Sequence, residues 1–600
     1  MLKPKPMQKA TVYCSRTRLQ DVISTLYSLG AVHLIDHVKD SQADIGEPMP
    51  QAAAISEVLT KVNAVATFLG IDLRAVEPKN NNKFTFAEYK EKVEILFEKV
   101  SALQQKAMSL QEQRQRSAKE ERLKLILDSL ELRPDMLHGF DTLTCQLFTA
   151  KEAPSPEELK QVTKHVTMVH APFEQGEAFA LFYTSAAKED MQAYLAKCTA
   201  TEVQLPKDFQ PEELKARQER LQAELTDISS QKKEIKEKVI RFLKRSELVM
   251  QEHLEKAQAP LHFAATENTV RITGYVPHDR TEAVRTALVD ATAGNIMVLF
   301  SLPEKNDSVP VRLSNKGGAK PFEFLMRLYT LPGYKDLDPT SLMFLTFPFF
   351  FGFMLGDIGY GIVGLILFMI LRKAIKTGKD LWGILMAASV GTILFGFLFG
   401  EVFGSEEIFG RELWHILSRA HEINQLLLLS LIVGAIHVNF GLLLGFFQEL
   451  HHGFVHAFCA KISWMVLQAG ALMIYFKVNP WGYGLVGLAI VLLLIGEGVR
   501  GIVELPSIFG NILSYSRLMA LGLASVMLAI IINEKAGGMI ASGGFGIAAG
   551  ILVLVLGHAI NLALGLLGPF LHSLRLHYVE FFSKFFHGGG QPYRPFGVQR

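Results

Sequence analysis

The spacing of apolar residues divides the chain into two halves. Up to about residue 340, apolar positions recur at helix or strand spacing among many charged residues, whereas beyond Thr340 long apolar runs follow one another. The runs occupy about 341–371, 381–403, 424–449, 457–476, 482–502, 507–533 and 546–586. Each is near or above the roughly 20 residues that a membrane-spanning helix needs. The pattern predicts a soluble N-terminal half followed by an all-α membrane domain.

The soluble half, about residues 1–330, has the pattern of two α/β lobes joined by long helices. Residues 7–39 follow a strand, helix, strand order. Two long, charged stretches with helical periodicity come later, and a similar strand, helix, strand order follows the second of them. Its expected parts are a proximal lobe (about 1–80 and 259–310), an antiparallel helical hairpin (about 84–135 and 211–258) and a distal lobe (about 136–207). We therefore expect an α+β dumbbell. The alternative is an ordinary globular α+β domain, but helices of this length span about 70 Å at 1.5 Å per residue and suit a spacer.

The first apolar run, 341–371, allows two topologies. It is either one long helix or a hairpin of two short spans that turns at Gly356 and Asp357. Lys and Arg in short loops mark the cytoplasmic side. The hairpin places the basic loop of residues 372–379 inside, together with the soluble half, whereas a single helix places it outside. We favour the hairpin, which gives eight spans in 341–586, a cytoplasmic tail from residue 587, and both termini in the cytoplasm.

Composition and motifs argue against several classes of function. A net charge of +2 gives no reason to expect nucleic-acid binding. The four cysteines, Cys14, Cys145, Cys198 and Cys459, have no metal-ligand spacing, so we expect neither a metal nor disulfides. The N-terminus lacks the apolar core of a signal peptide. The soluble half has no phosphate-binding loop, GxSxG or HExxH motif, which favours binding over catalysis and predicts no cofactor.

Arg517 is the residue that most needs an explanation. It lies about ten residues inside an apolar run, where a cation costs about 2.5–3.5 kcal/mol on insertion scales, so we expect it to face protein or water and to have a function. The alternative, snorkelling to an interface, does not suit its depth. Its helical neighbours Gly510, Ser514, Ala520 and Ala524 are small and would let another helix approach the guanidinium.

The last apolar run carries a polar stripe. At 100° per residue, one arc holds Asn561, Gly565, Gly568, His572 and Arg575. Arg575 lies nearer the expected cytoplasmic end and has snorkelling as a plain alternative. His572 alone would be explained as a satisfied core histidine.

The remaining acids and histidines of the membrane half fall at the outer ends of the expected spans, at their inner ends, or inside them. Asp357 and Glu401 fall at outer ends of the expected spans, and His437 falls inside one. The inner ends hold Glu449, His451, His452, Glu497 and Glu504. Acids at both ends with arginines between them are the pattern expected of two aqueous half-channels that do not meet. A single acid at a helix end is, by itself, often merely solvated.

Three segments, FPFFFGFMLGDIGYG, NILSYSRLMALGLAS and LHSLRLHYVEFFSKFF, resemble the signature segments of the a/I subunit of V-type and archaeal-type (A-type) rotary ATPases. The resemblance implies that Arg517 faces the carboxylates of a rotating proteolipid ring and that Arg575 supports it. It also implies coiled-coil peripheral-stalk subunits of the E/G type, a central-stalk adaptor of the d/C type, and ATP chemistry on other subunits. Ser525 and Gly565 stand where eukaryotic members carry His and Glu, so the chain is more similar to the prokaryotic subunit I of a plasma membrane.

A secondary transporter and a scaffold protein are the two alternative classes. A secondary transporter with a regulatory domain would show interrupted spans at matching positions of two halves, and only one interruption, at Gly356 and Asp357, is visible. A scaffold without transport would leave both arginines unexplained. The sequence leaves open whether H⁺ or Na⁺ is carried.

Overall fold

The computed structural model describes residues 3–39, 43–76, 84–137, 142–174, 176–198, 200–204, 209, 211–304, 307–375, 377–408, 411–450 and 453–597. The chain forms two compact units. One contains Met1–Gly46 with Leu261–Arg600, and the other contains Glu47–Pro260.

The first unit contains an antiparallel sheet, the proximal lobe, whose strands come from two separate parts of the chain. Its strands are β1 (Met7–Ser15), β2 (His33–Leu34), β3 (Asp44–Ile45), β8 (Ala264–Ala265), β9 (Thr269–Pro277) and β10 (Ile296–Ser301), in the order β10-β1-β9-β8-β3 with β2 also on β9. Val12 of β1 lies opposite Val298 and Ile272. Helices α1 (Leu19–Leu29) and α7 (Thr281–Ala291) pack together and bury Leu26 and Leu288.

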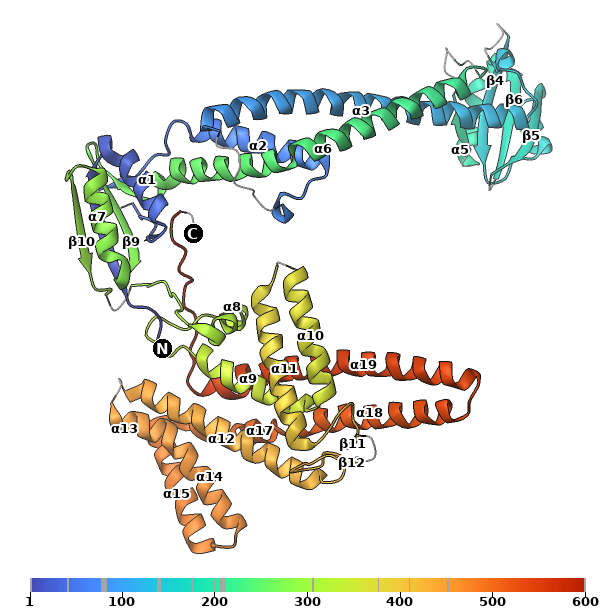
Figure 1. Cartoon of the computed structure of the whole chain (residues 1–600). Helices are drawn as coiled ribbons and strands as arrows, with labels where there is room; N and C mark the ends of the chain where they lie inside the picture. Colours follow the sequence, from blue (N-terminus) through green and yellow to red (C-terminus); the bar gives the residue numbers. More distant parts are fainter. Residues whose placement is uncertain are drawn as a thin grey trace. The chain divides into compact units, whose positions relative to one another are not determined.

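The second unit is built on two long helices. Helix α3 (Phe86–Ser129) has 44 residues and α6 (Leu214–Gln258) has 45, which is about 66 Å at 1.5 Å per residue. Thr85 and Glu88 form a capping box that starts α3. Tyr89 near the start of α3 shares a core with Met250 near the end of α6, so the helices run antiparallel (Figure 1). The long helical hairpin is therefore present within this unit.

Helix α2 (Ala52–Leu69) belongs to the hairpin rather than to the proximal lobe, whose expected boundary was about residue 80. It packs on both α3 and α6 and buries Ile55, Val58, Val62 and Val65 at helical spacing. This apolar stripe is complementary to the hairpin, which explains why the compact unit begins at Glu47.

The far end of the hairpin carries the distal lobe. Its four-stranded antiparallel sheet has the order β5-β6-β4-β7, and the elements are β4 (Leu143–Ala150), α4 (Pro156–Val162), β5 (Val166–Phe173), β6 (Gly176–Thr184), α5 (Lys188–Lys197) and β7 (Thr201–Val203). One face buries Phe179 and Leu181 with Leu159 and Met191 of α4 and α5. The other face packs on the end of α3 around Leu127.

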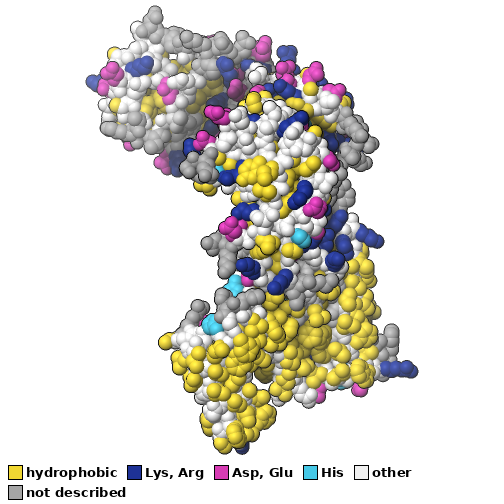
Figure 2. All heavy atoms as spheres, turned by 90° about the vertical axis from the view of Figure 1, so that its left-hand side faces the viewer, with side chains coloured by type: hydrophobic (Ala, Val, Ile, Leu, Met, Phe, Trp, Pro, Cys, Tyr) yellow, Lys and Arg dark blue, Asp and Glu magenta, His cyan; other side chains and the backbone are white. Residues whose placement is uncertain are grey.

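Beyond Thr340 the first unit is helical. The helices are α9 (Thr340–Leu355), α10 (Ile358–Ala374), α11 (Lys379–Phe399), α12 (Ile423–Glu449), α13 (Phe454–Ala457), α14 (Ser463–Tyr475), α15 (Asn479–Gly496), α16 (Val499–Val503), α17 (Leu505–Leu513), α18 (Ser516–Ala541) and α19 (Phe545–Arg575). Figure 2 shows hydrophobic side chains over most of this region, with few charged side chains among them.

By length and composition, six helical segments of the described chain are long and apolar enough to cross a membrane, and Thr340–Leu355 and Pro480–Gly496 are shorter apolar helices. One of the six is α2, whose apolar residues are explained by the hairpin core. The other five lie between Lys379 and Lys584. The helical region thus has the composition of an integral membrane protein.

Helix α9 has the central position among these helices, in contact with α11, α18 and α19. Its backbone meets that of α11 directly, because a Cβ added to Gly391 would lie 2.2 Å from the carbonyl oxygen of Pro348. The helix ends at Gly356, whose φ is +27°, and Asp357 caps α10 by accepting from the backbone N–H of Tyr360 at 2.8 Å. The run 341–371 is therefore divided in the structure where the hairpin alternative divides it.

Candidate functional site

The two arginines singled out by the sequence share one buried carboxylate. Arg517, in the first turn of α18, places Nη1 3.3 Å from Oε1 of Glu580, and Nε of Arg575 lies 3.9 Å from the same oxygen. The side chain of Glu580 is 2% exposed, against 28% for Arg517 and 52% for Arg575. Each guanidinium therefore has one side toward the carboxylate and part of its surface open.

Glu580 was missed by sequence reasoning. It follows Arg575 by five residues, and the helix changes to a π-helical turn over Leu576–Phe581. A π turn places residues i and i+5 near each other, which an ordinary α-helical stripe does not. The available signal was the acid itself, since an unpaired carboxylate in an apolar run calls for a partner.

The surface beside Arg517 is shallow and apolar. Gly510, Ala520 and Ala524 are exposed, and no atom lies within 4 Å of a Cβ added to Gly510. On α19, Leu564, Leu567 and Leu571 are 56–63% exposed. Apolar side chains so exposed beside a cation require lipid or an apolar partner helix to cover them.

A polar network, here called the Asn561 network, lies farther along the α18–α19 pair. It consists of Tyr360, Ser525, Asn533, His558 and Asn561. The hydroxyl of Tyr360 is 2.6 Å from Nδ1 of His558 and accepts from Nδ2 of Asn561 at 2.9 Å. The amide of Asn561 also donates to the carbonyl of Ser525, and His558 is 2.9 Å from the Asn533 side chain. Of these residues only Asn561 was expected as a site residue.

The acids Asp357 and Glu401 are buried at the end of α9. Asp357 accepts hydrogen bonds from the backbone of Tyr360 and Gly404, both at 2.8 Å. Glu401 pairs with Arg419, whose Nε lies 3.0 Å from Oε1, and both side chains are at most 1% exposed. Arg419 was not anticipated from the sequence, where it lies in the loop between the apolar runs 381–403 and 424–449.

The acids expected at the inner ends are partly buried. Glu449 is 3.1 Å from Nζ of Lys461, while Glu497 and Glu504 flank the short helix α16. The carbonyl of Lys584 lies 2.5 Å from a Cβ placed on Gly445, which brings the end of the last helix beside α12. His451 and His452 lie outside the described residues.

The histidines have different surroundings. His437 is 5% exposed, with Nδ1 2.6 Å from the hydroxyl of Tyr515 and its ring stacked on Phe581. This is the environment of a core histidine. His572 is half-buried, and its Nδ1 has no hydrogen-bond partner in the described part of the chain. It follows Gly568 on the same stripe and precedes Arg575 by one turn.

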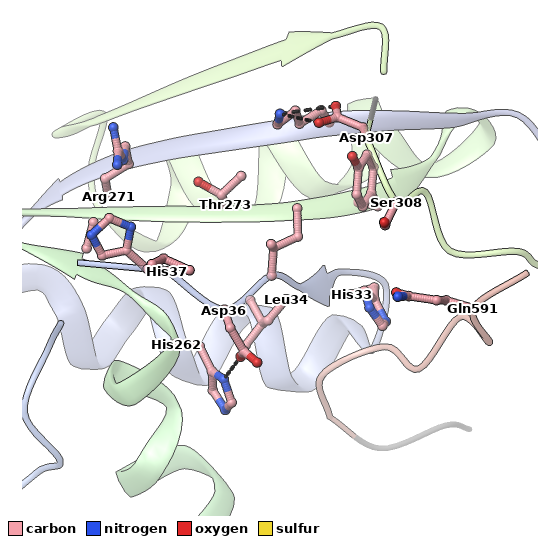
Figure 3. A pocket seen from close by; sticks show the side chains of 15 residues that line it. His33, Leu34, Asp36, His37, His262, Arg271, Thr273, Asp307, Ser308 and Gln591 are labelled. Atoms are coloured by element: carbon pink, nitrogen blue, oxygen red, sulfur yellow. Dashed lines mark hydrogen bonds and ion pairs between the residues drawn. The ribbon is translucent and has the colours of Figure 1, made fainter. Parts of the chain in front are cut away.

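A separate cavity of about 450 Å³ lies on the proximal lobe (Figure 3). Its charged side chains are largely paired, since Lys9 contacts Asp307 and His262 contacts Asp36. Gln591, from the C-terminal tail, forms part of its lining. Within the described residues, no group of three or more His, Cys, Asp or Glu side chains is arranged to hold a metal ion.

Comparison with known proteins identifies the family. The model of the V-type ATPase 116kDa subunit family matches residues 180–425 and 507–598. The chain is 30% identical to A-type ATP synthase subunit I of Archaeoglobus fulgidus, over 100% of this chain and 99% of that protein. It is 27% identical to the subunit I of Halobacterium salinarum, again over 100% and 99%. A crystal structure of the cytoplasmic N-terminal domain of subunit I, homolog of subunit a, of V-ATPase is 14% identical, with a TM-score of 0.30, over 49% of this chain and 100% of that chain.

The family expected from the three signature segments is thereby confirmed. The segments NILSYSRLMALGLAS and LHSLRLHYVEFFSKFF fall inside the second matched range, 507–598, and carry Arg517, Arg575 and Glu580. The relatives cover the chain from end to end. The chain belongs to the V-type ATPase 116kDa subunit family.

Proposed function

We propose that the chain is the membrane stator subunit of a rotary ATPase, has no catalytic site of its own, and conducts ions along its contact with a rotating ring of proteolipid subunits. The observation that carries the proposal is the arginine pair, Arg517 and Arg575, held beside the buried Glu580 and next to an uncovered apolar face of α18 and α19. Full-length relatives named subunit I of A-type ATP synthases support the same assignment.

The physical role of the pair follows from the cost of charge in lipid. A ring carboxylate crosses lipid when neutral but not when ionised. Arg517 supplies a positive charge where the ionised carboxylate passes the stator, and its open side is the side available for that contact. In the isolated chain Glu580 occupies the other side, so the ring carboxylate has to compete with an internal partner.

The two half-channels are assigned to the two ends of the α18–α19 pair. The Asn561 network, with Asp357 and Glu401, belongs to the outer one. His437, a further candidate, lies beside Tyr515 and Phe581 and is assigned to neither half-channel. The inner acids Glu449, Glu497 and Glu504, together with His451, belong to the inner one. Asn561 precedes Arg575 by 14 residues, a rise of about 21 Å, and His572 lies between them on the same stripe.

The membrane topology proposed with this function has eight spans and cytoplasmic termini in a prokaryotic plasma membrane. The break between α9 and α10 makes two spans of the first apolar run, and the basic residues of the α10–α11 connection, Arg372, Lys373 and Lys379, then face the cytoplasm. The same arrangement places Glu449, Glu497 and Glu504 on the cytoplasmic side.

The soluble half would resist torque. Each monovalent ion that falls through 100 mV releases about 2.3 kcal/mol, so several ions must be summed by rotation for each ATP. The long helices α3 and α6 and the distal lobe offer a stiff arm to coiled-coil peripheral-stalk subunits of the E/G type. A central-stalk adaptor of the d/C type completes the proposed set of partners.

Isolation of the chain from native membranes in mild detergent tests the assignment. A stator subunit is expected to bring a small ring-forming proteolipid and soluble ATPase subunits with it. A tagged, unrelated polytopic protein from the same membranes is the control for non-specific recovery. Recovery of the chain alone, with substrate transport that needs no ATPase subunit, would show a secondary transporter instead.

A further inference from the structure

The turn of α19 that follows the Asn561 network is apolar and closely packed. Gly565 lies one turn beyond Asn561 and is buried, and a Cβ added to it would lie 2.6 Å from Cδ1 of Leu355. Leu355 is 1% exposed. The same Cβ would lie 3.7 Å from Oγ of Ser525, a member of the network. The side chain of Leu355 therefore fills the space at Gly565, directly beside the last polar group of the network.

The position of Leu355 depends on how α9 ends. Leu355 is its last residue, and a helix end leaves carbonyl oxygens without helical partners. Arg419 supplies the donors: Nη1 donates to the carbonyl of Met354 at 3.3 Å and Nη2 to that of Gly356 at 2.8 Å. These two carbonyls flank Leu355 on either side, so one guanidinium fixes the backbone at that residue.

The guanidinium is itself held firmly. Glu401 pairs with it, and the ring of Phe399 lies 5.0 Å from its central carbon. Helix α18 closes the remaining side, since a Cβ added to Gly522 would lie 3.5 Å from Nη1 of Arg419 and 3.2 Å from the carbonyl of Met354. Gly522 follows Arg517 by five residues, a rise of about 7.5 Å along the helix. The fixed end of α9 therefore contacts α18 between Arg517 and Ser525, that is, between the arginine pair and the Asn561 network.

We propose that Leu355 is an apolar seal between the Asn561 network and the arginine pair, and that Arg419 is the positioning residue that holds the seal in place. The inference rests on the proposed ion-conducting function and adds the part that stops ions from passing straight through the stator. A seal of this kind works because a dry, filled contact offers an ion no oxygen ligands, whereas a cavity lined by polar groups takes up water.

The experiment uses complexes reconstituted in sealed vesicles, with two readouts: passive ion leak without ATP, and ions pumped per ATP hydrolysed. Leu355→Ala should raise the passive leak several-fold and lower the coupling ratio while ATP hydrolysis continues. Leu345→Ala is the matched control, because Leu345 is on the same helix but 71% exposed, and it should behave as the wild type. Leu355→Val, a smaller change, should give a smaller leak and decides the question if the alanine variant does not assemble.

The role of Arg419 is tested with Arg419→Met combined with Glu401→Gln, which removes both buried charges and keeps most of the volume. It should assemble and leak as Leu355→Ala does, because the carbonyls around Leu355 lose their donors. If the double variant does not assemble, Arg419→Lys, which keeps the charge but loses the paired donors, should leak instead.

Two results would overturn the proposal. If assembled Leu355 variants leak no more than the wild type, Leu355 is not a seal. If assembled Arg419 variants leak no more than the wild type, Arg419 does not position the seal. Failure of the proposed function itself would look different, because the wild type would then show no pumping that depends on Arg517.

Discussion

The carboxylate of Glu580 is the internal counter-charge of both Arg517 and Arg575. Glu580→Gln keeps the shape of the side chain and removes its charge, so Arg517 would hold an ionised ring carboxylate more tightly and release it more slowly. We expect an assembled complex whose ATP-driven ion uptake falls several-fold. Glu534→Gln, an exposed acid on α18, is the control. Uptake equal to that of the wild type would remove Glu580 from the mechanism.

A second residue-scale prediction concerns His33 on the proximal lobe. The backbone N–H of Arg594 in the C-terminal tail donates to its Nδ1 at 3.0 Å, next to the contact of the Phe596 N–H with the carbonyl of Val32. Burial lowers the pKa of His33 from 6.5; the charge of Arg594 lowers the pKa further, while a hydrogen bond to the Arg594 carbonyl and the charge of Asp36 raise it, with a net lowering. An Nδ1 atom that accepts the Arg594 N–H carries no proton, so this contact with the tail requires the neutral ring, which the net lowering of the pKa also favours.

The attachment of the C-terminal tail at His33 should depend on pH. A released tail leaves a His33 that binds a proton more readily, so attachment weakens as pH falls below about 6.5 and is insensitive to pH above it. Hydrogen exchange at the Phe596 amide, corrected for its intrinsic rate, should show this loss of protection between about pH 7.5 and pH 5.5. His33→Gln should remove the dependence, and the exposed His278→Gln should keep it. Protection that is constant with pH in the wild type would contradict the prediction.

At the residue scale, sequence reasoning found what stands out against an apolar background. Arg517 and Arg575 were visible because a cation in such a run is costly. Glu580 and Arg419 were not, for two reasons. A π turn sets the place of Glu580, and the partner of Arg419, Glu401, is distant enough in sequence that only the folded chain brings the pair together. Whether Asp357, Glu401, Glu449, Glu497 and Glu504 line ion paths stays a prediction.

At the scale of elements, the break between α9 and α10 requires a residue without a side chain at position 356. Gly356 has a φ of +27°, and a Cβ there would lie 2.6 Å from the ring of Phe399 and 3.1 Å from the carbonyl of Gly352. Gly356→Ala is expected to destabilise the complex by about 1–3 kcal/mol, through strain and displacement of the end of α9.

The matched control is Gly484→Ala, because Gly484 is helical and no atom lies within 4 Å of an added Cβ. Thermal unfolding of the purified complex in detergent measures both variants, and the midpoint should fall only for Gly356→Ala. Equal midpoints for the two variants would mean that the break tolerates a side chain.

Elements with a strong period were predictable and their partners were not. The charged, helix-periodic stretches gave α3 and α6, and alternation gave β1 and β9. The expected bounds of the proximal lobe, up to about residue 80, include α2, yet the apolar stripe of this helix is buried on the long helices. A stripe shows that a helix packs, but not on what.

At the scale of the whole molecule, the arm and the membrane helices should be separable. Removing about residues 136–207 deletes the distal lobe, which has its own sheet, one core of its own and a second core that it shares with the end of α3. The deleted protein should still insert and still recover the proteolipid, because the helices beyond Thr340 form their own core, while recovery of peripheral-stalk subunits falls. Affinity purification with quantitation of both classes of subunit is the measurement. Unchanged stalk recovery would count against the arm.

The central claim is that Arg517 provides a permanent charge at close range to an ionised ring carboxylate. Lysine keeps a charge but loses the planar guanidinium, which here contacts Glu580 on one side and is open on the other, and a desolvated lysine can lose its proton. The most direct test is ATP-driven ion pumping by purified complexes in sealed vesicles, with Lys535→Gln, an exposed cation on α18, as the control. The account predicts that Arg517→Lys assembles normally and loses nearly all coupled pumping, that Arg575→Lys retains part of it, and that Lys535→Gln is normal. Pumping by Arg517→Lys close to the wild-type rate would contradict it.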